Sequence, residues 1–158
     1  MSNSQYFYGH SPDAERAIAL GIQMIMDNRH PPVLTDMHIL WGLAASDRGK
    51  APEILRSHQI TAGDVLMAIK KKIGVQGKPV DRRPQIFLPE NISVDLSAIA
   101  VADKAREIAQ SSHARLVETE HQGLALIRLK RSARSILEKL DVVMLELEVE
   151  LLQAASKK

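Results

Sequence analysis

Apolar residues recur every three or four positions along most of the chain, which is the spacing of one face of an α-helix. In the first half the pattern falls into four segments, bounded by capping residues, proline or glycine. Ser11 and Pro12 open the first segment, and His30-Pro31-Pro32 ends it. The predicted helices follow Ser11, then run from Asp36 to about Ser46, from Ala51 to about His58 and from Thr61 to Gly74.

The second half predicts four more helices. They run from Ser93 or Asp95 to about Ser112, from about Thr119 to Leu129, from Ser132 to Lys139 and from about Val142 to Ala155. The last segment alternates apolar and polar residues as a strand does, but its repeated glutamates favour a helix. Between the halves, residues 75–91 contain three prolines and predict a loop or linker.

The two halves also repeat individual residues. The matched pairs are His30 with His113 and His38 with His121 at an offset of 83, then Ile54-Leu55 with Ile136-Leu137 and Ile60 with Val142 at an offset of 82. Such a duplication predicts two four-helix repeats packed about a pseudo-twofold axis. We expect an all-α, eight-helix fold in a single domain of residues 1–158, with repeat one at about 11–74, the linker at about 75–92 and repeat two at about 93–155.

The composition narrows the class of protein. Hydrophobic residues make up 45% of the chain and aromatic residues only 3%, so an aliphatic core of packed helices is expected. A net charge of +2 is too small to indicate a nucleic-acid surface by itself. The absence of cysteine excludes thiolate nucleophiles and cysteine zinc sites. Without a signal-peptide pattern or an apolar run of ~18 residues, we expect a cytoplasmic protein that does not enter membranes.

The duplicated pattern resembles the N-terminal domain of Clp AAA+ unfoldases. Each of the two copies in that family has a helix entry like Thr-Pro-Arg-Ala and a later helix that begins Thr-Glu-His-Leu-Leu. Here the first copy has Ser11-Pro12-Asp13-Ala14 and Met37-His38-Ile39-Leu40, and the second has Thr119-Glu120-His121. The resemblance covers about residues 11–153. It departs at Met37, where the family often has glutamate, and at Gln122-Gly123, where two leucines are usual.

The resemblance implies a non-enzymatic module that recognises client peptides or adaptor proteins of a Clp-type unfoldase–protease. No Gly-x-x-x-x-Gly-Lys-Ser/Thr loop occurs, so no nucleotide or other cofactor is expected. The alternative is a freestanding accessory subunit that binds the Clp protease complex itself.

Glu120 and Thr119 are candidate partner-binding residues. From the residues alone they open a helix, where Thr119 or its neighbour caps and carboxylates suit the positive end. The resemblance adds that the motif glutamate of some relatives helps to bind a cationic group on the client, including phosphorylated arginine. Because the first copy has Met37 at this place, we expect any such site in the second half only.

Two further segments are candidate contact sites. Tyr6-Phe7-Tyr8 either folds back onto the core or forms an exposed patch, and Phe7 is counted as a partner-binding candidate. Ile86-Phe87-Leu88 poses the same choice, and in relatives the groove beside the linker takes adaptors, so Phe87 and Arg83 are candidates too. The basic residues from Lys70 to Arg83 are a typical solvated surface; the rival interpretation is a weak nucleic-acid binder.

Four of the six histidines raise the question of a metal site, namely His30, His38, His113 and His121. The repeat predicts two symmetry-related pairs, one in each half, which do not converge. No His-x-x-x-His pattern occurs on a predicted helix. We therefore expect structural hydrogen bonds at helix ends and no metal.

Overall fold

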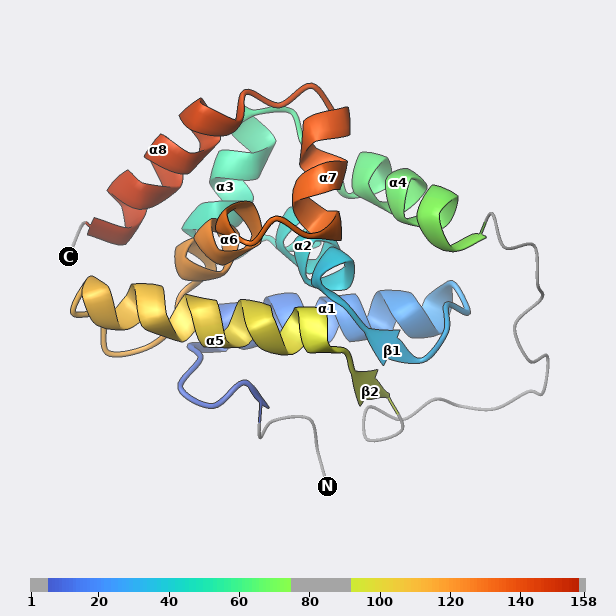
Figure 1. The fold of residues 1–158 in the computed structure, drawn as a ribbon, viewed down its shortest axis with the longest axis horizontal. Coiled ribbons are helices and arrows are strands. Elements are labelled where there is room, and N and C mark those ends of the chain that lie inside the picture. Colours follow the sequence, from blue (N-terminus) through green and yellow to red (C-terminus); the bar gives the residue numbers. More distant parts are fainter. Residues whose placement is uncertain (1–5, 75–91, 157–158) are drawn as a thin grey trace.

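The computed structural model describes residues 6–74 and 92–156, and its regular elements are almost all helices (Figure 1). The prediction of an all-α fold with eight helices is confirmed. The helices are α1 (Pro12–Asp27), α2 (Asp36–Ala45), α3 (Lys50–Ser57), α4 (Ala62–Gly74), α5 (Leu96–Ser111), α6 (Thr119–Arg128), α7 (Ser132–Lys139) and α8 (Met144–Ser156). Within the described ranges, none of these helices is long and apolar enough to cross a bilayer.

Helix lengths repeat between the two halves. α1 and α5 have 16 residues each, α2 and α6 have 10, α3 and α7 have 8, and α4 and α8 have 13. Left-handed residues repeat as well, with Arg29 and His113 after the long helices and Gln59 and Asp141 after the short ones. The duplication is therefore present in the backbone. The single-domain division and the linker at about 75–92 stay predictions, because residues 75–91 lie outside the described ranges.

Short parallel pairings tie each half to the other. β1 (Val33–Leu34) precedes α2 and pairs with β2 (Ser93–Val94), which precedes α5. At the symmetry-related place, Val117 before α6 forms a parallel bridge with His10 before α1. Asp95 is the N-terminal cap of α5. Its carboxylate accepts a hydrogen bond from the Ser97 N–H at 3.0 Å. The sequence predicted that this helix starts at Ser93 or Asp95. Ser93 lies in β2, and Asp95 is the helix cap.

The central helices α2 and α6 lie between the pair α1 and α5 and the remaining four helices (Figure 1). The first residue of each caps a short helix of the opposite half. The Ala133 N–H of α7 donates to the Asp36 carboxylate at 2.8 Å, and the Ala51 N–H of α3 donates to the Thr119 hydroxyl at 3.2 Å. Each hydrogen bond satisfies a helix-end donor that would otherwise be buried without a partner.

Candidate functional site

The start of α6 is shaped by a capping box. Glu118 has extended backbone angles, its side chain accepts the His121 N–H, and its own N–H donates to His121 Nδ1 at 2.8 Å. The same arrangement occurs at the start of α2, where the Thr35 N–H donates to His38 Nδ1 at 3.1 Å. The cap predicted at Thr119 or its neighbour is therefore Glu118. Histidine takes the role that Glu or Gln has in the usual capping box.

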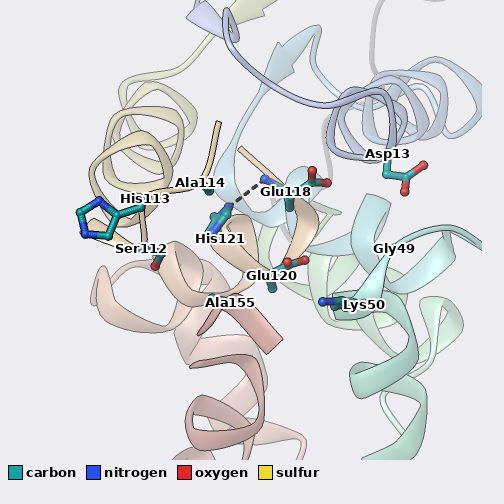
Figure 2. A pocket seen from close by; sticks show the side chains of 10 residues that line it. All are labelled: Asp13, Gly49, Lys50, Ser112, His113, Ala114, Glu118, Glu120, His121 and Ala155. Carbon is teal, nitrogen blue, oxygen red and sulfur yellow. Dashed lines mark hydrogen bonds between the residues drawn. The ribbon is translucent and has the colours of Figure 1, made fainter. Parts of the chain in front are cut away.

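A cavity of about 480 Å³ opens beside this helix start (Figure 2). α6 contributes Glu120 and His121, the residue before it contributes Glu118, α1 contributes Asp13, and α3 contributes Lys50. The remaining lining residues are Gly49, Ser112, His113, Ala114 and Ala155. Three carboxylates thus share one cavity with a single lysine, which makes it suited to a cationic group.

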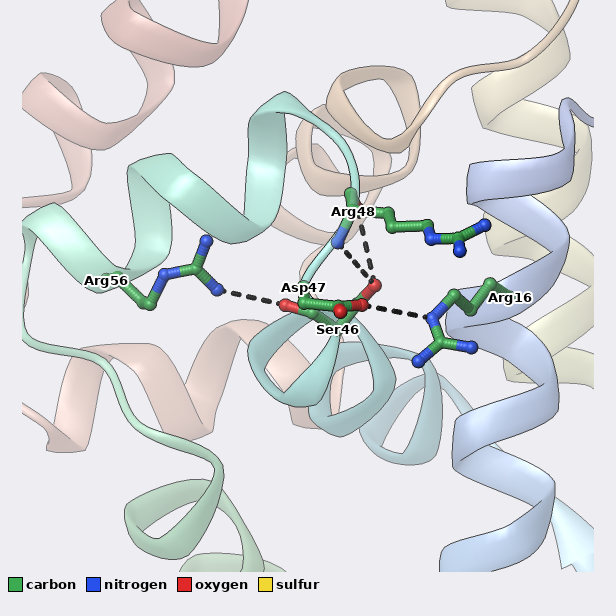
Figure 3. Close-up of polar contacts among 5 residues, drawn as sticks. All are labelled: Arg16, Ser46, Asp47, Arg48 and Arg56. Carbon is green, nitrogen blue, oxygen red and sulfur yellow. Dashed lines mark hydrogen bonds and ion pairs between the residues drawn. The ribbon is translucent and has the colours of Figure 1, made fainter.

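The turn between α2 and α3 (Figure 3) leads into Lys50, which lines this cavity (Figure 2). Ser46 Oγ accepts the Arg48 N–H at 3.1 Å, and the Ser46 carbonyl accepts a hydrogen bond from Arg56 at 2.9 Å. An exposed ion pair of 3.3 Å between Arg16 and Asp47 links the turn to α1 and adds little stability on its own.

Gly49 ends this turn with a φ of +105°. A Cβ there would lie 2.4 Å from Thr119 Oγ1, so both the backbone angle and the close approach require glycine. The position of Lys50 in the cavity thus depends on the contact between Gly49 and Thr119.

Glu120 is 7% exposed although it lines the cavity. Burial raises the pKa of its carboxyl above the ordinary value, and the charge of Glu118 acts in the same direction, while Lys50 opposes it. The Thr119 hydroxyl donates to Glu120 Oε1 at 3.5 Å. A carboxylate held in this way has lost much of its hydration, so a bound cation would stabilise its charged form.

Only one of the two symmetry-related places in the fold is acidic. α1 and α5 begin at Pro12 and Leu96, an offset of 84, and α2 and α6 begin at Asp36 and Thr119, an offset of 83. By these offsets Asp13, Glu118 and Glu120 correspond to Ser97, Thr35 and Met37. The symmetry-related place around Thr35, Met37 and Ser97 therefore has no carboxylate at any of the three positions.

The histidine pairing predicted by sequence is correct in one half and wrong in the other. His30 Nδ1 lies 3.4 Å from His38 Nε2, and both rings are buried. His113 is exposed. It corresponds to Arg29 and not to His30, because α1 and α5 are offset by 84 residues, whereas the two histidines match at an offset of 83. Ala114 takes the place of His30, and His121 Nε2 is buried without a partner in the described part of the chain.

Burial lowers the pKa of both capping-box histidines. Burial, with a smaller contribution from the charge of His30, lowers the pKa of His38 to about 3. Burial lowers the pKa of His121 to about 4. Both rings are therefore neutral near pH 7. Among the described residues, no group of three or more His, Cys, Asp or Glu side chains could hold a metal ion.

The other predicted contact residues are placed as follows. Thr119 is 1% exposed, so it can act on a partner only by positioning α3 and Glu120. Phe7 folds back onto the core at 6% exposure, the first of its two alternatives, while Tyr8 is exposed and the Arg106 guanidinium lies 4.1 Å from its ring centroid. Phe87 and Arg83 lie outside the described ranges.

Sequence reasoning missed Asp13, Lys50 and Glu118 as residues of the site. Glu118 adjoins the motif and could have been included from its position alone. Asp13 and Lys50 come from α1 and α3, and only tertiary packing brings them to α6.

The chain is similar to a known protein family and to several solved structures. A family model described as the Clp repeat (R) N-terminal domain matches residues 10–140. No curated protein matches the sequence. Among solved structures, the N-terminal domain of the caseinolytic protease associated chaperone ClpD from Arabidopsis thaliana has a TM-score of 0.73 at 20% identity, over 93% of this chain and 97% of that chain.

Two further structures are similar in fold. A chain from a malarial protein secretion system has a TM-score of 0.71 at 16% identity, with 95% of this chain and 97% of that chain covered. The N-terminal domain (residues 1–163) of the ClpV1 ATPase from the type VI secretion system Sci1 of E. coli EAEC has a TM-score of 0.62 at 15% identity, with 92% and 85% covered. At these identities the structural matches show the fold alone.

Proposed function

Because this chain belongs to the Clp repeat N-terminal domain family, we propose that it recognises substrates or adaptors of a Clp-type unfoldase–protease through the cavity around Glu120. Clp N-terminal domains are non-catalytic modules that bind substrates and adaptors of Clp unfoldases. In the proposal the chain acts in the cytoplasm by reversible docking, without bond chemistry and without nucleic acid.

The buried carboxylate of Glu120 is the observation that carries this proposal. It lines an acidic cavity at the start of α6, which a lysine or arginine side chain of an extended client peptide can enter. Glu118 and Asp13 lie around the same cavity and add negative charge. Lys50 gives the cavity one cation, which suits the phosphate of a phosphorylated arginine while Glu120 binds its guanidinium.

A charge-removing substitution tests the role of Glu120. We expect Glu120→Gln to weaken binding of an arginine-containing client peptide at least about ten-fold, because a charge-assisted hydrogen bond to a buried acceptor is lost. The measurement is titration calorimetry with the arginine peptide and with its citrulline analogue, which keeps the shape but has no charge. The citrulline peptide should bind wild type and Glu120→Gln equally weakly.

Glu138→Gln on α7 is the matched control. Glu138 is an exposed glutamate in an ion pair of 3.2 Å with Arg134, away from the cavity, so its loss should leave peptide binding unchanged. Equal affinities of wild type and Glu120→Gln for the arginine peptide would rule out the proposed site. An accessory subunit that docks on the protease complex would instead bind that complex regardless of Glu120.

A further inference from the structure

A second concave surface lies between α4 and α7, apart from the Glu120 cavity. It encloses about 250 Å³, with Met67, Ile136 and Leu140 among its lining residues. Lys71, Lys72 and Lys139 also line it, and Asp64 is its one acidic residue. Met67 is 64% exposed, so an apolar side chain is presented to solvent among lysines. We call this surface the α4–α7 groove.

The repeat explains why the α4–α7 groove is open. The offset between α4, which begins at Ala62, and α8, which begins at Met144, is 82, as it is between α3 and α7. By this offset, Ala68 and Leu140 of the groove correspond to Glu150 and His58. Those two side chains meet at 2.7 Å at the symmetry-related place, between α8 and the C-terminal cap of α3. Ala68 and Leu140 cannot form such a pair, and the alanine in place of a glutamate leaves space at the groove.

α8 presents a complementary surface. Leu145, Val149 and Leu152 are 72%, 43% and 43% exposed, and their spacing of four and three residues places them on one helix face. The opposite face packs into the core through Leu147 and Leu151. Glu146 is exposed beside the apolar face. We call this surface the α8 stripe: an exposed aliphatic row on an acidic helix.

The two surfaces lie at opposite ends of the molecule, since α4 and α8 occupy opposite sides of the fold (Figure 1). We propose that the α8 stripe of one copy docks into the α4–α7 groove of a second copy, so that copies associate head to tail. Aliphatic side chains meet Met67 and Leu140, and Glu146 faces Lys71 and Lys139. This association goes beyond the recognition function and leaves the Glu120 cavity free.

The geometry sets what kind of assembly results. The surfaces differ, so the contact is heterologous and propagates into a chain or closes into a ring. A single helix face in a shallow groove is smaller than the ~800 Å² per partner of a standard stable interface. The association is therefore weak and depends on protein concentration and on salt.

Paired charge reversals test the proposal. One variant carries Lys71→Glu and Lys139→Glu in the groove. The other carries Glu146→Lys and Gln153→Lys on α8, where Gln153 is exposed next to Leu152 of the stripe. Sedimentation velocity from about 10 μM to about 1 mM spans the range expected of a weak interface. We expect the wild-type mass to rise with concentration, each variant alone to stay monomeric, and an equimolar mixture of the two variants to associate again.

Lys130→Glu is the control, because it changes the net charge at an exposed position that does not line the groove. It should associate as wild type does, and circular dichroism should show native helix content for every variant. A wild-type chain that stays monomeric throughout the range overturns the proposal, as does a variant that still associates alone or a mixture that does not. Peptide binding at Glu120 is expected to be the same in all of them, so either claim can fail without the other.

Discussion

Replacing Gly42 with alanine is expected to lower the free energy of unfolding by roughly 3 kcal/mol or more, the upper end of overpacking effects. A Cβ at Gly42 would lie 1.8 Å from the Ala17 carbonyl oxygen, 2.8 Å from its carbon and 3.3 Å from its Cα. All three atoms are backbone, so no side chain can turn aside, and α1 must move off α2. Chemical denaturation followed by circular dichroism measures this effect.

Gly63→Ala is the matched control for this substitution. Gly63 lies in α4, and among the described residues only Thr61 Oγ1, at 3.8 Å, would lie within 4 Å of a Cβ at this position. Alanine there should raise stability by roughly 0.5–1 kcal/mol, because it favours the helix over the unfolded chain. If Gly42→Ala is as stable as wild type, the close crossing of α1 and α2 is not a feature of the folded protein.

Acidification from pH 7 to pH 5 is expected to destabilise the protein through His38 and His121. Their folded pKa values of about 3 and about 4 lie below the ordinary value of 6.5. The unfolded chain therefore binds these protons first, so the stabilisation is complete above pH 6.5 and is lost as the pH falls towards the folded values. Each fully linked histidine costs about 1.4 kcal/mol per pH unit, or roughly 2 kcal/mol by pH 5.

His38→Gln separates this effect from other titrations. Glutamine at the third helical position still accepts the Thr35 N–H, as in the usual capping box, but it takes up no proton. The variant should lose stability less steeply between pH 6.5 and pH 5, whatever its stability at pH 7. His113→Gln, at an exposed ring, is the control for the replacement of a histidine by glutamine. An unchanged slope in His38→Gln would show that the buried imidazole is not the titrating group.

Local sequence signals were sufficient for most helix ends. Ser11 with Pro12 begins α1, Asp95 caps α5, and Ser132 to Lys139 matches α7 at both ends. These signals are local, because a cap or a proline acts on the backbone of its own helix turn. The left-handed residues Arg29 and His113 were not predictable in this way, since neither is glycine.

The alignment of His30 with His113 failed because it rested on residue identity and not on position in the backbone. The two histidines suggested the match because they are the same residue type. Which positions of the two repeats are equivalent in the backbone depends on the number of residues in each helix and its cap. His113 follows the Ser112 cap as Arg29 follows the Asn28 cap. Residue identity thus located the repeat but not its register at this point.

The candidate site was predictable only in part. The motif identified Glu120 and its loss at Met37, because both lie in one short segment. The same motif made Thr119 a candidate for direct binding, whereas its hydroxyl caps α3 across the repeat boundary. Contacts between helices far apart in sequence also bring Asp13 and Lys50 to the cavity, and no local pattern encodes such packing.

The central claim is that the cavity around Glu120 binds a cationic client group and the symmetry-related place around Met37 does not. Amide chemical shifts recorded during titration with the arginine peptide test it most directly. The account predicts shifts at Lys50 and from Glu118 to His121, with the equivalent amides of Ser132 and from Thr35 to His38 unmoved, and much smaller shifts in Glu120→Gln at the same peptide concentration. Shifts at both sets of residues, or at Ser132 and Thr35 to His38 alone, would contradict it.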